Sequence, residues 1–235
     1  MIAPYPDSKR KNKMSRELSL RKIILSLVGF VLLWAVLSDA WGFSEHLHFN
    51  GGTYVYAYFS KLVWAAPAGW LIIRFQKSLQ FGPKELFSHP VWNKSLAITL
   101  GASVLYAAVM MFVTHRGFWF NPDVNPALEL IKLALVGIVE ETVFRGWGYN
   151  ALSNAVSEKK AVLISAAFFI AVHWPAYIIK LLRFGTFDFA GILSQSIAAL
   201  IWGILNCWLL KKGKTLWNPI IAHTVYDVLL VFFVG

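Results

Sequence analysis

Seven long apolar runs dominate the sequence, and each is close to the roughly 20 residues that a helix needs to cross a lipid bilayer. The runs cover residues 23–41, 54–75, 94–113, 127–147, 161–179, 189–210 and 217–234. Short polar connections separate them, with loop signals at Gly51-Gly52, Gly82-Pro83, Asn121-Pro122 and Lys211-Lys212-Gly213. The pattern predicts an all-α, polytopic transmembrane helical bundle of about seven spans.

Composition agrees with that prediction and excludes several other classes of protein. Of the 235 residues, 57% are hydrophobic and only 14% are charged, which is too little charge for a soluble domain of this length. The single cysteine, Cys207, lies in an apolar run, which argues against a disulfide framework and a thiolate metal site. The formal net charge of +10 could indicate nucleic-acid binding. Basic residues placed on one side of a membrane explain that charge better, so we expect no nucleic-acid partner.

The distribution of basic residues orients the predicted bundle. We interpret residues 1–22 as a basic cytoplasmic tail that can contact anionic lipid, and residues 23–235 as a single transmembrane domain. With seven helices, the tail shares its side of the membrane with Arg74, Lys77, Lys84, Lys159, Lys160, Lys211, Lys212 and Lys214. The opposite loops carry fewer basic residues, namely Arg116, Lys180 and Arg183. The positive-inside rule therefore places the N-terminus in the cytoplasm and the C-terminus outside.

Two of the runs leave alternatives open. The first could be a signal peptide, since Ser38-Asp39-Ala40 resembles a cleavage site. It is rather long for that role and many spans follow, so we expect an uncleaved first helix. The second run has Lys61 at its middle, where a lysine either snorkels to the interface or marks a tilted or interfacial helix.

Three charges lie together near the end of the fourth run, in Val139-Glu140-Glu141-Thr142-Val143-Phe144-Arg145-Gly146. Charge at membrane depth is unfavourable and is a functional-site hypothesis by default. Glu141 and Arg145 are i,i+4 neighbours on one helical face, whereas Glu140 is about 100° round from Glu141. We therefore predict that Arg145 pairs with Glu141 and leaves Glu140 free for chemistry. The simpler alternative is a solvated ion pair where a helix reaches the membrane surface.

Two later runs each contain a histidine. His173 precedes Trp174-Pro175, and a proline inside a helix kinks it and frees a backbone carbonyl. His223 and Asp227 are i,i+4 neighbours, so they share one face of the last run. Taken singly, each histidine could serve only an interhelical hydrogen bond or a packing pair.

Polar groups on three apolar helices avoid lipid and should face one another inside the bundle. Such a pocket suits hydrolysis, because a carboxylate or histidine can take a proton from water while a second polar group stabilises the oxyanion. A glutamate and two histidines could equally hold a zinc ion with one open position. The depths agree poorly, since Glu140 and His223 lie roughly 10 Å from the inner ends of their runs. His173 lies deeper, unless its helix begins later or tilts.

In this order, the three stretches resemble the signature of the CAAX protease and bacteriocin-processing family of intramembrane proteases, also called the Abi family. Its Glu-Glu-x-x-x-Arg motif is present as residues 140–145, its Phe-x-x-x-His motif as Phe169 to His173, and its His-x-x-x-Asn or Asp motif as His223 to Asp227. The resemblance covers about residue 127 to the C-terminus. It implies a multi-pass, helical endopeptidase that cuts a peptide near the membrane, and we expect it in a bacterial cell membrane.

The resemblance also implies roles for the residues of the first two motifs. In the family's glutamate-type mechanism, Glu140 and His173 would activate the water. Glu141 and Arg145 would support the site. The eukaryotic members of the family remove the last three residues of prenylated CAAX proteins, so the implied partners are a membrane-associated peptide or protein substrate and the bilayer itself.

The third motif departs from the simplest form of that mechanism. His223 and Asp227 would steady the oxyanion, yet an ionised aspartate cannot donate a hydrogen bond. Asp227 must therefore be protonated, orient another donor or serve a metal. We favour a site without a cofactor, and zinc is the alternative.

Two other classes of function compete with a membrane peptidase. The family name also covers bacteriocin-immunity or protein-interaction membrane proteins without catalysis. Intramembrane carboxylates and histidines also build proton relays in transporters and channels. The set of Glu140, His173 and His223 favours hydrolysis over pure binding, and the absence of two matching halves in the sequence argues against a typical secondary transporter.

Overall fold

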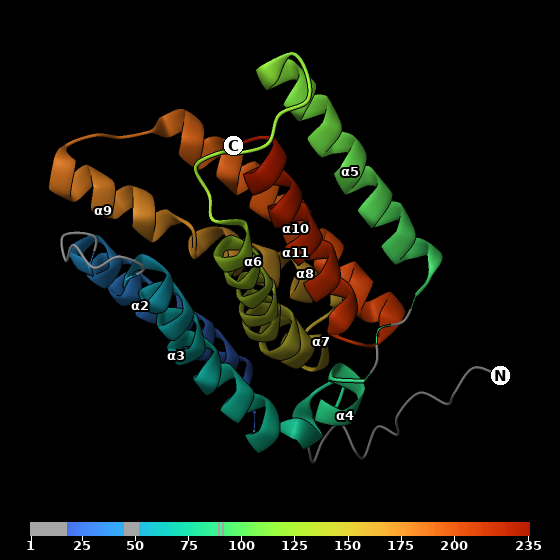
Figure 1. The fold of residues 1–235 in the computed structure, drawn as a ribbon. Coiled ribbons are helices and arrows are strands. Elements are labelled where there is room, and N and C mark those ends of the chain that lie inside the picture. Colours follow the sequence, from blue (N-terminus) through green and yellow to red (C-terminus); the bar gives the residue numbers. More distant parts are fainter. Residues whose placement is uncertain (1–17, 45–51, 89, 91) are drawn as a thin grey trace.

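The regular elements in the described part of the chain are all helical (Figure 1). The computed structural model describes residues 18–44, 52–88, 90 and 92–235. Its elements are α2 (Leu20–Ser44), α3 (Gly52–Arg74), η1 (Gln76–Ser78), α4 (Pro83–Leu86), α5 (Lys94–His115), α6 (Pro126–Glu141), η2 (Thr142–Tyr149), α7 (Asn150–Ala155), α8 (Glu158–Ala171), α9 (Trp174–Phe184), α10 (Phe189–Gly213) and α11 (Trp217–Phe233). The all-α prediction is confirmed, and most of the predicted tail in residues 1–22 lies outside the described residues.

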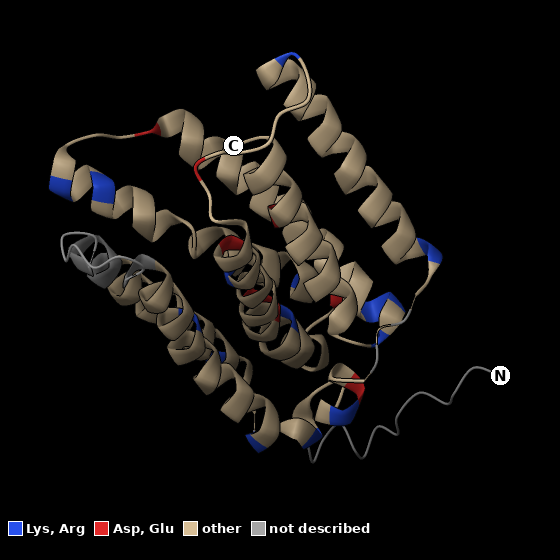
Figure 2. Cartoon of the chain, in the orientation of Figure 1, with Lys and Arg blue, Asp and Glu red and all other residues tan. Residues whose placement is uncertain are grey.

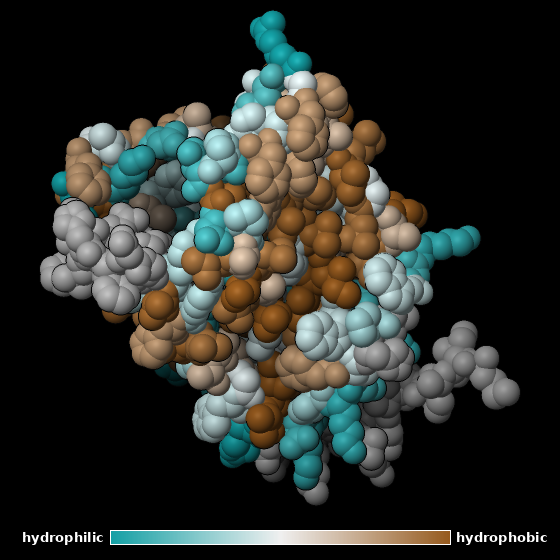
Figure 3. Space-filling view, viewed as in Figure 1, coloured by the Kyte–Doolittle hydropathy of each residue, from teal (hydrophilic) through white to brown (hydrophobic). Residues whose placement is uncertain are grey.

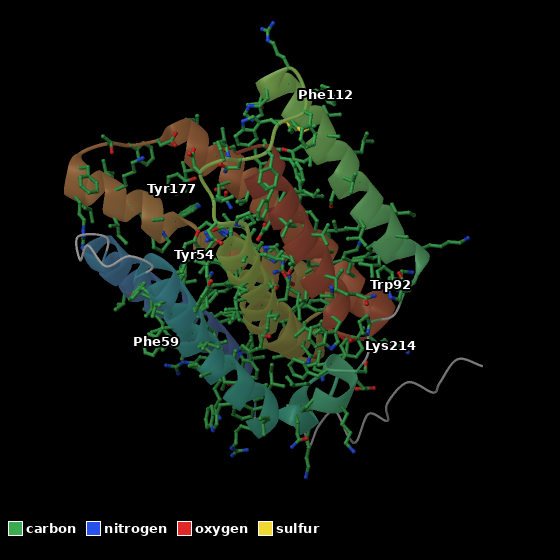
Figure 4. All side chains as sticks on the ribbon, in the orientation of Figure 1. Tyr54, Phe59, Trp92, Phe112, Tyr177 and Lys214 are labelled. Carbon is green, nitrogen blue, oxygen red and sulfur yellow. The ribbon has the colours of Figure 1, made fainter. Side chains whose placement is uncertain are left out.

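Four helical stretches are long and apolar enough to cross a membrane, namely 20–38, 94–115, 158–184 and 189–213. The molecule also exposes large apolar side chains broadly, as Figure 3 shows by the brown face between two teal ends. Phe59 on α3 and Phe112 on α5, labelled in Figure 4, are 61% and 58% exposed. Such a surface suits lipid rather than water, so this is an integral membrane protein. The number of seven spans stays a prediction.

Basic residues gather at one end of the bundle, where α3 and α10 end (Figure 2). The opposite end carries fewer of them, on α5 and α9. The positive-inside rule assigns the end with more basic residues to the cytoplasm. The orientation of the chain in the membrane stays a prediction.

α6 and η2 lie at the centre of the bundle (Figure 1). α2 and α3 pack on one side of them, while α8, α10 and α11 pack on the other, and α5 lies against α11. Small residues bring the central helices close together. A Cβ added to Gly137 of α6 would collide with Thr224 of α11, and one added to Gly203 of α10 would collide with Ala166 of α8.

The helical segment that contains the fourth predicted run extends beyond the apolar residues of that run. The helix does not end at residue 147 but continues through η2, a π-helical segment, and α7 to Ala155. The polar residue that enables this extension is Asn150, which is fully buried. Its Oδ1 accepts from the backbone N–H of Phe81 at 2.8 Å, and its Nδ2 donates to the carbonyl oxygens of Phe81 and Gly146 at 2.9 and 3.1 Å. A buried amide with its hydrogen bonds satisfied is compatible with an apolar interior.

The fifth predicted run is broken, as the proline predicts. α8 ends at Ala171, four residues before Pro175, which is the spacing at which a proline ring clashes with a helical carbonyl. α9 then starts at Trp174 and follows a different course from α8 (Figure 1).

The connection after α3 is more ordered than a plain loop. Gly82-Pro83 opens the one-turn helix α4, whose Leu86 is fully buried. The carbonyl of Leu86 accepts from the backbone N–H of Leu216 at 2.8 Å, just before α11 begins. α4 therefore packs against the start of α11. Leu216 and Asn218, at that start, are fully buried.

Candidate active site

All six residues predicted for the site come together between α6, α8, α10 and α11. A cavity of about 220 Å³ is lined by Glu140, His173, His223 and Asp227, and its walls include Val136, Phe169, Gln195, Ala198, Ala199, Trp202, Tyr226 and Leu230. Glu141 and Arg145 lie beside it and are fully buried. The surface ion pair that was the simpler alternative for the first motif is therefore wrong.

Glu141 is the centre of a hydrogen-bond network behind the cavity. Its Oε1 accepts from Arg145 Nη1 at 3.0 Å, from Asn206 Nδ2 at 2.8 Å and from His223 Nδ1 at 2.7 Å. The predicted pairing of Glu141 with Arg145 is thus present. We call Glu141, Arg145 and Asn206 the support network.

Arg145 fastens this network to the surrounding helices. Its Nη2 donates to the backbone carbonyl of Trp202 on α10 at 3.2 Å. Its guanidinium also lies 4.2 Å from the centre of the Phe169 ring on α8, which is within the range of a cation–π interaction. One arginine therefore joins three elements that carry site residues.

Glu140 faces the cavity, and it has a partner that the sequence did not indicate. Its Oε1 accepts from the ammonium of Lys61 on α3 at 2.9 Å, while its Oε2 lies 3.9 Å from His223 Nε2. Lys61 is only 8% exposed and its ammonium pairs inside the protein, so the side chain does not snorkel. The physical reason is that α3 packs against α6, where an ammonium in apolar surroundings requires a counter-charge. Whether α3 is tilted or interfacial stays a prediction.

His173 uses the backbone carbonyl that the helix break releases. The backbone N–H of His173 donates to Ile170 at 3.0 Å rather than to Phe169, the carbonyl four residues back. The Phe169 carbonyl oxygen instead lies 2.7 Å from His173 Nδ1. Because a carbonyl only accepts, Nδ1 carries the proton of this bond, and Nε2 is available as an acceptor when the ring is neutral.

His223 connects the support network with the cavity. Its Nδ1 bonds to Glu141, and its Nε2 lies between Glu140 Oε2 and Asp227 Oδ2, 3.9 and 3.5 Å away. The His223 ring stacks on Trp202 with 6.5 Å between ring centres and 16° between planes. The predicted common face of His223 and Asp227 is present.

The positions of Glu140 and His173 along their helices now agree, and both line one cavity. α6, η2 and α7 lead to a turn at residues 156–157, and α8 leads away from it. Glu140 and His173 lie the same number of residues from the two ends of that turn. The apparent shallowness of Glu140 came from ending its helix at residue 147.

Two contributors to the site were missed at the level of sequence. Lys61 was noticed as a lysine inside an apolar run, but its partner is 79 residues away. Asn206 is fully buried in α10 and bonds to Glu141, yet nothing in its own run distinguishes it from a polar residue used for packing.

Zinc fits this arrangement poorly. In the described part of the chain, no group of three or more His, Cys, Asp or Glu side chains is arranged to hold a metal ion. The ammonium of Lys61 on Glu140 Oε1 would repel a second cation beside that carboxylate.

Residues 123–229 match the family model described as type II CAAX prenyl endopeptidase Rce1-like. The match contains all three motifs and all six predicted site residues. This part of the chain is similar to that family. The resemblance to the CAAX protease and bacteriocin-processing family is therefore confirmed. No curated protein and no solved structure matches the chain. The matched segment covers α6 to most of α11, so Lys61 on α3 lies outside it.

Proposed function

We propose that the protein is an intramembrane endopeptidase that hydrolyses a peptide bond near the membrane, by a water that Glu140 and His173 activate. The observation that carries the proposal is that two carboxylates and two histidines line a single cavity inside an apolar bundle. The match of residues 123–229 to CAAX prenyl endopeptidases supports the same class of reaction.

Water activation uses two of the groups in the cavity that can accept a proton, Glu140 and His173. Glu140 Oε1 is bonded to Lys61, so Oε2 is the oxygen available as general base. His173 Nε2 is a second acceptor, because Nδ1 is bonded to the Phe169 carbonyl. Water placed between these atoms gives a proton to Glu140 as its oxygen attacks the scissile carbonyl. When the C–N bond breaks, the same proton goes to the departing amine.

His223 Nε2 is the donor best placed to stabilise the oxyanion. With Nδ1 bonded to the Glu141 carboxylate, a proton on Nε2 lies near Asp227 Oδ2. Asp227 then acts by orienting and compensating a protonated His223, rather than by donating a hydrogen bond itself. This assignment resolves the difficulty that an ionised aspartate poses for an oxyanion hole.

A membrane-associated peptide or protein is the substrate class that this site fits. Candidates are prenylated CAAX-type peptides, peptide pheromones, bacteriocin leaders and anchored proteins, and the bilayer brings such a substrate to the cavity. Catalysis, rather than immunity by binding, is the function proposed.

Membrane proteomics tests the proposal in cells. A deletion strain and a Glu140→Gln strain are compared with the parent, and one peptide should accumulate uncut in both. In purified protein, Glu140→Gln should lower the cleavage rate of that peptide by about 10²-fold or more, the scale of a general base. A Glu140→Gln strain that behaves as the parent does would favour immunity by binding.

A further inference from the structure

We propose that Lys61 is a positioning residue of the active site, which holds the Glu140 carboxylate in its reactive orientation. The proposal rests on the proposed function, since it assigns Lys61 a part in the same reaction. Lys61 belongs to α3 and lies outside the segment that matches the endopeptidase family.

The ammonium of Lys61 is enclosed by two aromatic rings and one carboxylate. It lies 2.9 Å from Glu140 Oε1, 4.2 Å from the centre of the Trp34 ring and 5.6 Å from that of Trp64. Trp64 is itself fixed, because its Nε1 donates to the backbone carbonyl of Phe30 at 2.9 Å. The lysine as a whole is only 8% exposed, so its side chain is packed inside the protein.

This contact divides the work between the two oxygens of Glu140. Lys61 holds Oε1, and Oε2 is directed to the side where His223 Nε2 lies, 3.9 Å away. The other charged or titratable groups that face Glu140 are His223 and Asp227 on α11 and His173 across the cavity. Without the ammonium, the carboxylate can rotate toward His223 or take up a proton in its apolar surroundings. Either change removes the base from the water.

A purely structural role would also place a salt bridge between α3 and α6, so the experiment must separate docking from positioning. The chain offers a matched control for docking. Tyr58 lies on α3 close to Lys61, and its hydroxyl donates to the backbone carbonyl of Leu128 on α6 at 2.8 Å. Tyr58→Phe removes one contact between these same two helices and leaves Glu140 untouched.

The test measures kcat, KM and thermal stability for purified Lys61→Met, Lys61→Arg and Tyr58→Phe, on the peptide that Glu140→Gln leaves uncut. Lys61→Met keeps the length of the side chain and removes the charge. It should lower kcat by about 10- to 100-fold, the scale of a misplaced catalytic group, and leave KM within about twofold. Lys61→Arg keeps a cation and should retain more kcat than Lys61→Met. Tyr58→Phe should lower stability and leave kcat near the parent value.

Three results would overturn the proposal. Lys61→Met could retain the parent kcat. Lys61→Met and Tyr58→Phe could lose stability and rate in parallel, which would reduce Lys61 to docking α3. If Lys61→Met does not fold, a folded Lys61→Arg that is as inactive as Glu140→Gln would contradict it.

Glu140→Gln keeps the two proposals apart, because a fully active Glu140→Gln rejects the proposed function itself. An inactive Glu140→Gln beside a fully active Lys61→Met rejects only the role of Lys61.

Discussion

Glu140 and Glu141 are neighbours in sequence, yet they belong to two different regions of the molecule. Glu141 lies in the support network, where one of its oxygens accepts three hydrogen bonds from Arg145, Asn206 and His223. Glu140 lies on the wall of the cavity, where one oxygen is held by Lys61 and the other faces His223 at a longer distance. A helix turns about 100° per residue, and that rotation is enough to separate the two environments.

The difference teaches that two neighbouring carboxylates can have different roles, one in holding helices together and one in facing a cavity. A carboxylate oxygen that three donors already occupy is well suited to hold helices together. A carboxylate that keeps one oxygen toward a cavity can still accept a proton from water. Substitutions in the support network should therefore affect folding first, and substitutions on the cavity wall should affect the rate first.

The largest expected effect is on folding, from Arg145→Ala. This change leaves the buried Glu141 carboxylate without its cation, and breaking a buried ion pair in this way typically destabilises by about 3–5 kcal/mol. We expect a sharp loss of folded protein in detergent, measured by size-exclusion yield and by the thermal unfolding midpoint. Arg145→Lys should lie between this variant and the parent, because lysine cannot reproduce bonds to both Glu141 and the Trp202 carbonyl. A normal yield with full activity in Arg145→Ala would contradict the structural role of the support network.

The next effect is on rate, from His173→Gln. The glutamine removes proton acceptance at Nε2, so the cleavage rate should fall by about 10²-fold. The unfolding midpoint should change little, because the His173 ring is only partly buried and its Nδ1 bonds to a nearby backbone carbonyl, that of Phe169. Steady-state kinetics and a melting curve on one preparation check both points. If rate and stability fell in parallel, His173 would have a structural role rather than a role in water activation.

A smaller effect is expected from Asp227→Asn. The asparagine oxygen can still accept from His223 Nε2, but it no longer compensates the charge of a protonated ring. The rate should fall by about 5- to 30-fold, since charged hydrogen bonds exceed neutral ones by about 1–2 kcal/mol. Asp227→Leu, which removes the acceptor altogether, should fall further. An unchanged rate in Asp227→Leu would remove Asp227 from the mechanism.

The smallest expected effect is that of a chelator. If Glu140 and His173 activate water by themselves, purified enzyme should keep its rate after prolonged chelation. Metal content per mole of protein, measured beside the rate, completes the test. Stoichiometric zinc whose removal and return switch cleavage off and on would reverse our assignment in favour of metal-bound water.

The sequence alone determined the features that depend on local geometry. The pairing of Glu141 with Arg145 and the common face of His223 and Asp227 follow from the i,i+4 spacing of a helix. The break before Pro175 follows from the clash of a proline ring with a helical carbonyl. Apolar run lengths predicted the helical bundle, and the order of the three motifs pointed to the endopeptidase family.

Only the tertiary structure decided which distant groups meet. Lys61 reaches Glu140 across 79 residues, and Asn206 reaches Glu141 across 65, because α3 and α10 pack on opposite sides of the central helix. Hydropathy placed the end of that helix too early, because the buried Asn150 is satisfied by Phe81, a partner from another part of the chain. Helical periodicity fixes which residues share a face, whereas the packing of one helix against another fixes what that face meets.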